Sequence, residues 1–170
     1  MNLKPLVLAL CLLAPTVGFA QAVPASETAI NAVIESFRTS IITKDQTTFL
    51  NLFHGKAIPW IGVLDDESLQ RVRKQNPKAR KAQPLGTPGP VPFMKWIKGS
   101  KMLMEEKFSN IRITTDGNIA SVVFDYSFHE GAYKSNWGQE AWQLVNTDKG
   151  WKINSVIYTV HENPEPAPKP

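Results

Sequence analysis

The sequence has almost no cysteine and no long apolar run, the two features that would indicate a cross-linked or membrane-embedded protein. Its only cysteine among 170 residues is Cys11, so the chain beyond it has no disulfide, no thiolate metal ligand and no thiol nucleophile. The apolar run Leu6–Leu13 is too short for a membrane-spanning helix, which needs about 20 apolar residues. We therefore expect no stable membrane insertion, and a fold that its hydrophobic core alone must stabilise.

Charge of either sign is also modest, since 19 Lys and Arg stand against 15 Asp and Glu for a net charge of +4. This balance does not require a nucleic-acid partner, and we expect none. Hydrophobic residues make up 42% of the chain and charged residues 20%, which excludes a disordered or fibrous protein and fits one globular domain.

The first 22 residues have the pattern of a secretory signal peptide. Lys4 supplies the positive start, Leu6–Leu13 form the apolar centre, and Ala20-Gln21-Ala22 fits the small-x-small cleavage pattern. A lipid anchor is disfavoured because a leucine, rather than a small residue, precedes Cys11. We expect cleavage near Ala22 and a periplasmic or secreted protein.

Apolar residues at helical spacing predict helices in the first half of the chain. Ser26 is a suitable N-cap for an amphipathic helix whose apolar stripe is Ile30, Val33, Ile34, Phe37 and Ile41. Asp45 can cap a shorter helix that stops at Gly55 and carries Phe49, Leu50, Leu52 and Phe53. Pro92 can open a third helix, with a buried stripe of Phe93, Trp96, Ile97 and Met104.

From residue 110 the apolar period changes to two, which predicts strands at 111–113, 119–128, 137–146 and 151–160. In the second of these strands Tyr126 and Phe128 share one face, and Asp125 points to the other. A short strand at 58–63 is confined by Pro59 to a sheet edge or to the first strand positions. Helices followed by an antiparallel meander predict an α+β domain over residues 23–162.

Two segments are rich in proline. Residues 64–92 are predicted to be a basic, extended loop with a short helix around 67–74. Basic residues crowd positions 71–81, where they either attract an anionic partner or form a solvated arm. Aromatic residues are missing from this stretch, which argues against stacking on bases. The tail, residues 163–170, alternates prolines and is predicted to be disordered.

The predicted first helix ends at Lys44-Asp45, which Phe49-Leu50 follows, and the chain closes with the phrases Asn136-Trp137-Gly138-Gln139-Glu140, Trp142-Gln143-Leu144-Val145 and Gly150-Trp151-Lys152-Ile153-Asn154-Ser155-Val156. Over residues 27–161 the chain resembles the nuclear transport factor 2-like superfamily, with its polyketide-cyclase-like and ketosteroid-isomerase-like relatives. The resemblance implies a cone, in which a curved, cystatin-like antiparallel sheet wraps around helices and leaves a pocket at its open end. It also implies a homodimer through the outer sheet face, where the long strand presents Ile119, Ser121, Val123 and Asp125.

Isomerase chemistry of this superfamily needs a carboxylate base and acid donors in an apolar cone, with a tyrosine on the first helix as the expected donor. The predicted first helix has no tyrosine, so that site does not carry over. Glu140 shares its parity with Trp142 and is expected to point into the cone, as a functional carboxylate or as a rim carboxylate paired with a base or a Trp N–H. Asp125 points away from the aromatic face, and His54 can titrate near neutrality or simply cap a helix end.

Five tryptophans are many for this length, and aromatic residues can line a pocket for a flat or apolar molecule. Trp96 is assigned to the core. The expected pocket residues are Trp60, Tyr126, Phe128, Trp142, Glu140 and His54. We expect no metal and no cofactor, because the three histidines are widely separated and no glycine-rich phosphate loop is present.

The sequence therefore predicts an exported, non-catalytic protein that binds a small apolar or aromatic molecule. One alternative is an isomerase, cyclase or dehydratase that uses Glu140, His54 or Asp125 as its acid or base. Another is a protein-interaction module of the cell envelope, with the basic segment 71–81 as its contact surface.

Overall fold

Most of the helical residues precede the sheet, as the change of apolar period predicts. The computed structural model describes residues 22–84 and 88–167. Its helices are α1 (Ala22–Thr43), α2 (Gln46–Asn51), α3 (Asp66–Gln75) and α4 (Pro90–Gly99). Its strands are β1 (Trp60–Leu64), β2 (Ala82–Gln83), β3 (Met104–Thr115), β4 (Ile119–Glu130), β5 (Tyr133–Thr147) and β6 (Gly150–Glu162). The predicted signal peptide lies, except for its last residue, outside the described residues and stays a prediction.

The described strands form one sheet in the order β2-β1-β6-β5-β4-β3, which is not closed into a barrel. Strands β3 to β6 make the predicted antiparallel meander. The sheet is mixed rather than antiparallel throughout, because β1 runs parallel to β6 with Trp60 opposite Val156. The cause lies just before β1, where the backbone of residues 52–54 hydrogen bonds to Ile153 near the start of β6. The chain therefore enters β1 and β6 from the same end.

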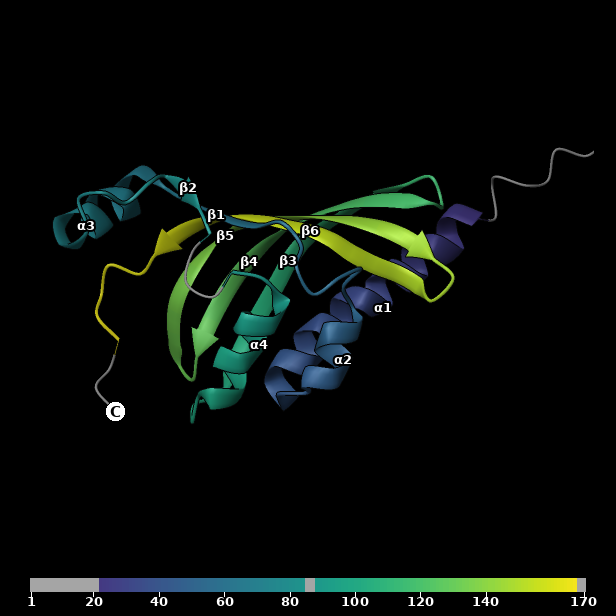
Figure 1. Cartoon of the computed structure of the whole chain (residues 1–170), viewed down its shortest axis with the longest axis horizontal. Coiled ribbons are helices and arrows are strands. Elements are labelled where there is room, and N and C mark those ends of the chain that lie inside the picture. Colours follow the sequence, from purple (N-terminus) through teal and green to yellow (C-terminus); the bar gives the residue numbers. More distant parts are fainter. Residues whose placement is uncertain (1–21, 85–87, 168–170) are drawn as a thin grey trace, which may run out of the picture.

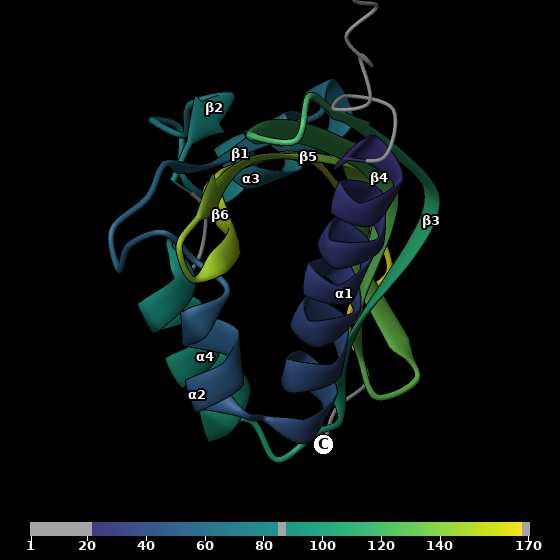
Figure 2. The ribbon, with the colours of Figure 1, turned by 90° about the vertical axis from the view of Figure 1, so that its right-hand side faces the viewer.

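The sheet is curved, and three helices lie on its concave face. Figure 1 shows α1, α2 and α4 on the same side of the sheet, and Figure 2 shows the sheet bending around them. Register shifts at Ser109/Arg112, Phe128/His129 and Gln143/Leu144 interrupt the strand ladders. Such bulges bend strands and increase their twist, which accounts for the curvature. The α+β arrangement of helices on a curved sheet is confirmed.

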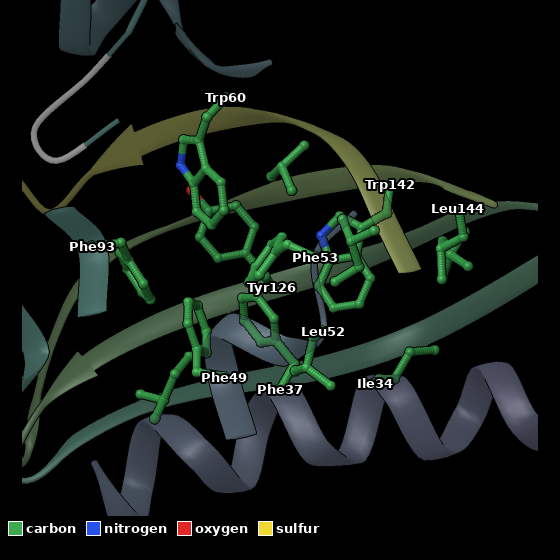
Figure 3. Close-up of a cluster of buried hydrophobic side chains, with 14 of the residues drawn as sticks. Ile34, Phe37, Phe49, Leu52, Phe53, Trp60, Phe93, Tyr126, Trp142 and Leu144 are labelled. Carbon is green, nitrogen blue, oxygen red and sulfur yellow. The ribbon is translucent and has the colours of Figure 1, made fainter. Parts of the chain in front are cut away.

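An aromatic cluster fills the space between α1 and the sheet. The predicted stripe of α1 is buried at Ile30, Ile34, Phe37 and Ile41. The ring of Phe37 lies 4.8 Å from that of Trp142 on β5 and 5.0 Å from that of Phe49 on α2. Figure 3 shows how the labelled side chains of α1, α2 and the sheet converge in this core. The cluster fixes α1 and α2 on the sheet, because apolar burial is the main stabilising contribution to such contacts.

Alternation along β4 follows the prediction. Ala120, Val122, Phe124, Tyr126 and Phe128 are all buried on the concave face. Asp125 lies on the opposite face, where its carboxylate accepts a hydrogen bond of 2.7 Å from Asn110 Nδ2. The side chains of β4 that face the helices therefore form one wall of the interior.

The structure confirms one predicted helix cap and corrects others. Helix α1 begins at Ala22, so Ser26 lies inside it rather than at its N-cap, and α2 ends at Asn51 rather than at Gly55. The Asp45 side chain accepts from the Thr48 N–H at the start of α2, as predicted. Helix α4 begins at Pro90 and ends at Gly99, so the prediction that Met104 belongs to its stripe was wrong. Met104 is instead the first residue of β3 and is fully buried there. Strand β3 is consequently much longer than the predicted segment 111–113.

The basic segment 71–81 begins within α3, which coincides with the predicted short helix and lies beyond one end of the cone (Figure 1). A small apolar cluster of Leu64, Leu69, Ala79 and Val160 attaches it to the sheet. Arg71 donates to the Glu162 carbonyl, Arg73 to the Ala79 carbonyl, and Lys81 pairs with Asp66 at 2.6 Å. These three cations therefore have partners within the chain.

The described part of the predicted tail begins against the sheet. The Asn163 side chain donates to the Lys134 carbonyl, and the Tyr133 hydroxyl donates to the Glu165 carbonyl, each at 2.8 Å. Among the described residues, none of the helices has the length and apolar character that crossing a membrane requires.

Candidate functional site

A pocket of about 630 Å³ opens between α4 and the concave face of the sheet. Strands β1, β3, β4, β5 and β6 all contribute side chains to it. The lining residues are Trp60, Phe93, Trp96, Glu106, Tyr126, Phe128, Glu130, Tyr133, Ser135, Asn136, Glu140, Tyr158, Val160, Glu162 and Asn163. The volume is that of a site for a small organic molecule.

Aromatic rings from α4 and the sheet form the walls. Trp60 on β1 lies 5.6 Å from Phe93 on α4, measured between ring centroids. Trp96, one turn further along α4, stacks on Phe128 of β4 at 5.3 Å with an interplanar angle of 29°. Trp96 is 39% exposed, so its ring is available at the entrance. Figure 3 shows Trp60, Phe93 and Tyr126 together at one end of the aromatic cluster.

Two carboxyl groups meet inside the pocket. Glu106 on β3 and Glu140 on β5 line it, each side chain belongs to a residue only 4% exposed, and the carboxyls hydrogen bond to one another. Glu140 Oε1 also accepts a short hydrogen bond of 2.5 Å from Trp142 Nε1. This N–H fixes the orientation of Glu140 from behind, in the fully buried core. We refer to Glu106 and Glu140 below as the carboxyl pair.

Burial changes the acidity of the carboxyl pair. It raises the pKa of Glu106 well above the usual range, and the neighbouring Glu140 raises it further. Burial also raises the pKa of Glu140, to about 7, although its hydrogen bonds with Trp142 and Glu106 oppose this shift. Two buried carboxyls in contact cannot both ionise readily, so the pair retains a proton near neutral pH. One carboxyl can then donate to the other.

Two tyrosines beside the pair stay neutral. Burial, followed by the charges of Glu140 and Glu106, raises the pKa of Tyr126 above its ordinary value. Burial also raises the pKa of Tyr158 to about 12. The Tyr126 hydroxyl donates to the Thr159 carbonyl at 2.9 Å, and Asn136 Oδ1, at 3.0 Å, is its alternative acceptor. Both phenols therefore present uncharged polar groups to the pocket, and hydrogen bonds hold the Tyr126 hydroxyl in place.

The charges that line the pocket are all of one sign. Its acidic side chains are Glu106, Glu130, Glu140 and Glu162, and among the described residues no Lys, Arg or His lines it. None of these four glutamates takes part in a salt bridge among residues 22–84 and 88–167. Within the same ranges no group of three or more His, Asp or Glu side chains is placed to hold a metal ion.

Solved structures with a similar fold are numerous, although no protein-family model and no curated protein matches the chain. A nuclear transport factor 2-like superfamily protein from Salmonella enterica serovar Typhimurium has a TM-score of 0.56 and 18% identity, over 84% of this chain and 96% of that one. A nuclear transport factor 2-like protein with a cystatin-like fold, from Novosphingobium aromaticivorans, has a TM-score of 0.59 and 9% identity, over 87% and 91%. The chain has the nuclear transport factor 2-like fold.

A third similar structure, also from Novosphingobium aromaticivorans, is described as a candidate scytalone dehydratase. Its TM-score is 0.57 and its identity 14%, over 83% of this chain and 87% of that one. These comparisons confirm the resemblance that the closing sequence phrases indicate. At such low identities they establish the fold alone, so the function must be argued from the pocket itself.

The nuclear transport factor 2-like cone brings four of the predicted site residues together. Trp60, Tyr126, Phe128 and Glu140 all line the pocket. Trp142 stands behind Glu140 in the core and reaches the site only through its N–H. Glu140 points into the cone as predicted and is paired with a Trp N–H, but it is buried rather than at the rim.

The structure separates His54 and Asp125 from these four residues. His54 is exposed after α2, where its backbone N–H donates to the Ile153 carbonyl, and it borders a second, smaller depression near Lys149 and Lys152. Asp125 lies on the outer sheet face because its parity is opposite to that of Tyr126. Neither residue can act together with the carboxyl pair.

Sequence reasoning missed Glu106, Tyr158, Phe93 and Trp96 as pocket residues. The most important omission, Glu106, follows from ending the third helix too late, since Met104, Glu106 and Phe108 alternate inward once β3 begins at residue 104. The same alternation in β6 places Tyr158 between the inward-facing Val156 and Val160. A strand assigned from residue 104 onward would have revealed the second carboxylate.

Proposed function

We propose that the protein binds a small, largely apolar or aromatic molecule in this pocket without transforming it. The observation that carries the proposal is the pocket itself, whose walls are the faces and edges of aromatic rings and whose interior holds a few fixed polar groups. Such sites bury most of a ligand and use their polar groups to orient it. The ligand would lie against the rings of Trp60 and Phe93, with its polar end toward the carboxyl pair.

Substitution of a wall residue tests the proposal. Trp60→Ala removes one ring of the pocket, and Trp137→Ala is its matched control because Trp137 stacks on His161 outside the pocket lining. Native mass spectrometry of protein purified from its own source reveals a retained small molecule as added mass. We expect wild type and Trp137→Ala to retain it and Trp60→Ala to lose it. Equal retention in both variants would contradict the proposal.

A second candidate function is acid–base catalysis of the isomerase, cyclase or dehydratase type. The carboxyl pair favours it, because a buried carboxyl that retains a proton near neutral pH can donate one, and its partner can accept one. Glu140→Gln discriminates between the two functions. If the protein is a catalyst, the wild type converts the retained molecule and Glu140→Gln binds it without converting it. If the protein only binds the molecule, the wild type releases it chemically unchanged.

We further propose that the protein is exported and acts as a homodimer. Its export is supported by the signal-peptide pattern of the first 22 residues. The dimer is supported by an outward-facing apolar row that crosses the sheet, with Ile61 opposite Ile157, Ile157 opposite Ala141 and Ala141 opposite Val123. Ile157 is 53% exposed, which is unusual for an isoleucine in the middle of a sheet unless a partner covers it.

A further inference from the structure

The pocket combines aromatic walls with carboxyl groups that have no cation to pair with. We infer that its ligand is an organic cation, an amine or quaternary ammonium group carried on an apolar or aromatic body. The inference rests on the proposed binding function, because it names the chemical class of the molecule that the pocket takes. It adds a sign of charge, which neither the fold nor the pocket volume implies.

The charge in the pocket differs in sign from that of the whole chain. The whole chain carries a net charge of +4, yet its pocket is lined by four glutamates and by no basic side chain. The described salt bridges use Glu35, Asp65, Asp66, Glu67 and Glu105, all of them outside the pocket lining. The described salt bridges thus leave the four pocket glutamates without a basic partner, and their carboxyl groups can interact favourably with a cation.

Burial makes a negative charge on the carboxyl pair unfavourable. Glu106 and Glu140 are each 4% exposed, and within residues 22–84 and 88–167 the N–H of Trp142 is the only one that donates to them. A negative charge held there without a counter-ion is costly, because the low-dielectric interior replaces its hydration poorly. An ammonium group entering the pocket supplies the missing counter-charge and removes this cost. A neutral ligand leaves the cost in place, and an anion increases it.

The aromatic walls of the pocket also favour a cation. Rings of Trp60, Phe93, Trp96 and Phe128 line the same pocket as the pair. The face of an aromatic ring attracts cations through its quadrupole, most strongly for tryptophan and most of all when the cation is desolvated. A purely apolar ligand would gain only the hydrophobic part of this contact. The walls and the carboxyl pair therefore select for the same sign of charge.

The remaining two glutamates suit the entrance of such a site. Glu130 and Glu162 end strands β4 and β6 and are half-buried at the pocket. Their charges attract a cation toward the opening before it is desolvated. This arrangement would place the ammonium group at the carboxyl pair and the apolar body against the rings of α4 and Trp60.

The test compares probes of one shape and three charges: naphthylmethylamine, which is a cation at neutral pH, the neutral naphthalenemethanol, and the anion naphthoate. Isothermal titration calorimetry measures the dissociation constant of each with the full chain at neutral pH. We expect the amine to bind at least about tenfold more tightly than the alcohol, and naphthoate more weakly than either. In the double variant Glu106→Gln/Glu140→Gln the amine and the alcohol should bind alike.

Glu105→Gln is the matched control, since Glu105 is adjacent to Glu106 on β3 but pairs with Lys107 outside the pocket lining. It should keep the wild-type preference for the amine. Alcohol and amine that bind equally to the wild type overturn the cation inference and leave the proposed binding function standing. Failure of all three probes to bind the wild type overturns both. The comparison of the three probes uses the wild type alone, so its outcome does not depend on whether a variant folds.

Discussion

The carboxyl groups of Glu106 and Glu140 contact one another although β4 separates their strands in the sheet. They can do so because the sheet is curved, so that side chains on the concave faces of β3 and β5 converge above β4. Tyr126 of β4 lies on the same face and also lines the pocket. The curvature that forms the cone is therefore also what creates the acidic group inside it.

The first prediction concerns the pH dependence of stability. Both carboxyls of the pair have a raised pKa in the folded protein, so the folded state binds more protons than the unfolded chain above the ordinary value of 4.5. The free energy of unfolding should therefore fall as the pH rises from 4.5 through about 7. Urea unfolding at a series of pH values measures this slope.

The variants isolate the contribution of the pair. Glu106→Gln/Glu140→Gln removes both titrations, so its unfolding free energy should change less over this window than that of the wild type. Glu105→Gln should keep the wild-type slope. The other ionisable groups facing the pair, Tyr126, Tyr158, Glu130 and Glu162, are unchanged in these proteins. A double variant with the wild-type slope would show that the pair titrates as ordinary carboxyls do.

The second prediction concerns the Trp142 N–H. Glu140→Gln keeps an oxygen acceptor for this buried donor, whereas Glu140→Leu removes it. A buried donor without an acceptor costs about 1–3 kcal/mol, so the Leu variant should be less stable than the Gln variant by that amount. Urea unfolding at one pH compares them, and equal stabilities would mean that the N–H finds another acceptor.

The third prediction concerns Gly138, which lies opposite Tyr126 in the sheet. A Cβ atom at this position would overlap the carbonyl and the side-chain hydroxyl of Thr159. Gly138→Ala should therefore destabilise the fold by about 1–3 kcal/mol, because backbone must move to admit the methyl group. It should also weaken ligand retention, since the Thr159 carbonyl accepts from the Tyr126 hydroxyl in the pocket.

Thermal unfolding followed by circular dichroism measures the effect of Gly138→Ala. Gly55→Ala is the control, because a Cβ there meets no atom within 4 Å. Its unfolding temperature should stay close to that of the wild type. If the two alanine variants are equally stable, the close approach of Gly138 to Thr159 is not a constraint on this sheet.

Features of the fold could be predicted from the sequence where they depend on neighbouring residues. The alternation of β4 is a local property of consecutive residues, so the inward position of Tyr126 and the outward position of Asp125 followed from it. The parallel pairing of β1 with β6 was not predictable, because the hydrogen bonds that align them join residues about a hundred positions apart. No local pattern encodes such a contact.

The site shows the same division. Glu140 was found because Trp142 marks the inward parity of β5, and its N–H is indeed the partner of the carboxylate. Glu106 was missed because the boundary between α4 and β3 was placed wrongly, and element boundaries depend on competition between neighbouring segments. The exclusion of His54 from the pocket is a matter of tertiary arrangement, which its own neighbours do not reveal.

The last prediction concerns the apolar row on the outer face of the sheet. Ile157 is the most exposed member of this row and has Ile61 and Ala141 as its direct neighbours. A twofold contact uses the same surface of both subunits, so a glutamate there would bury an unpaired charge twice in the apolar interface. Ile157→Glu should therefore convert a dimer to a monomer that remains folded. Leu103→Glu, a change of an equally exposed apolar residue outside the sheet, should leave the dimer intact. Analytical ultracentrifugation measures both, and a monomeric wild type would contradict the proposed dimer directly.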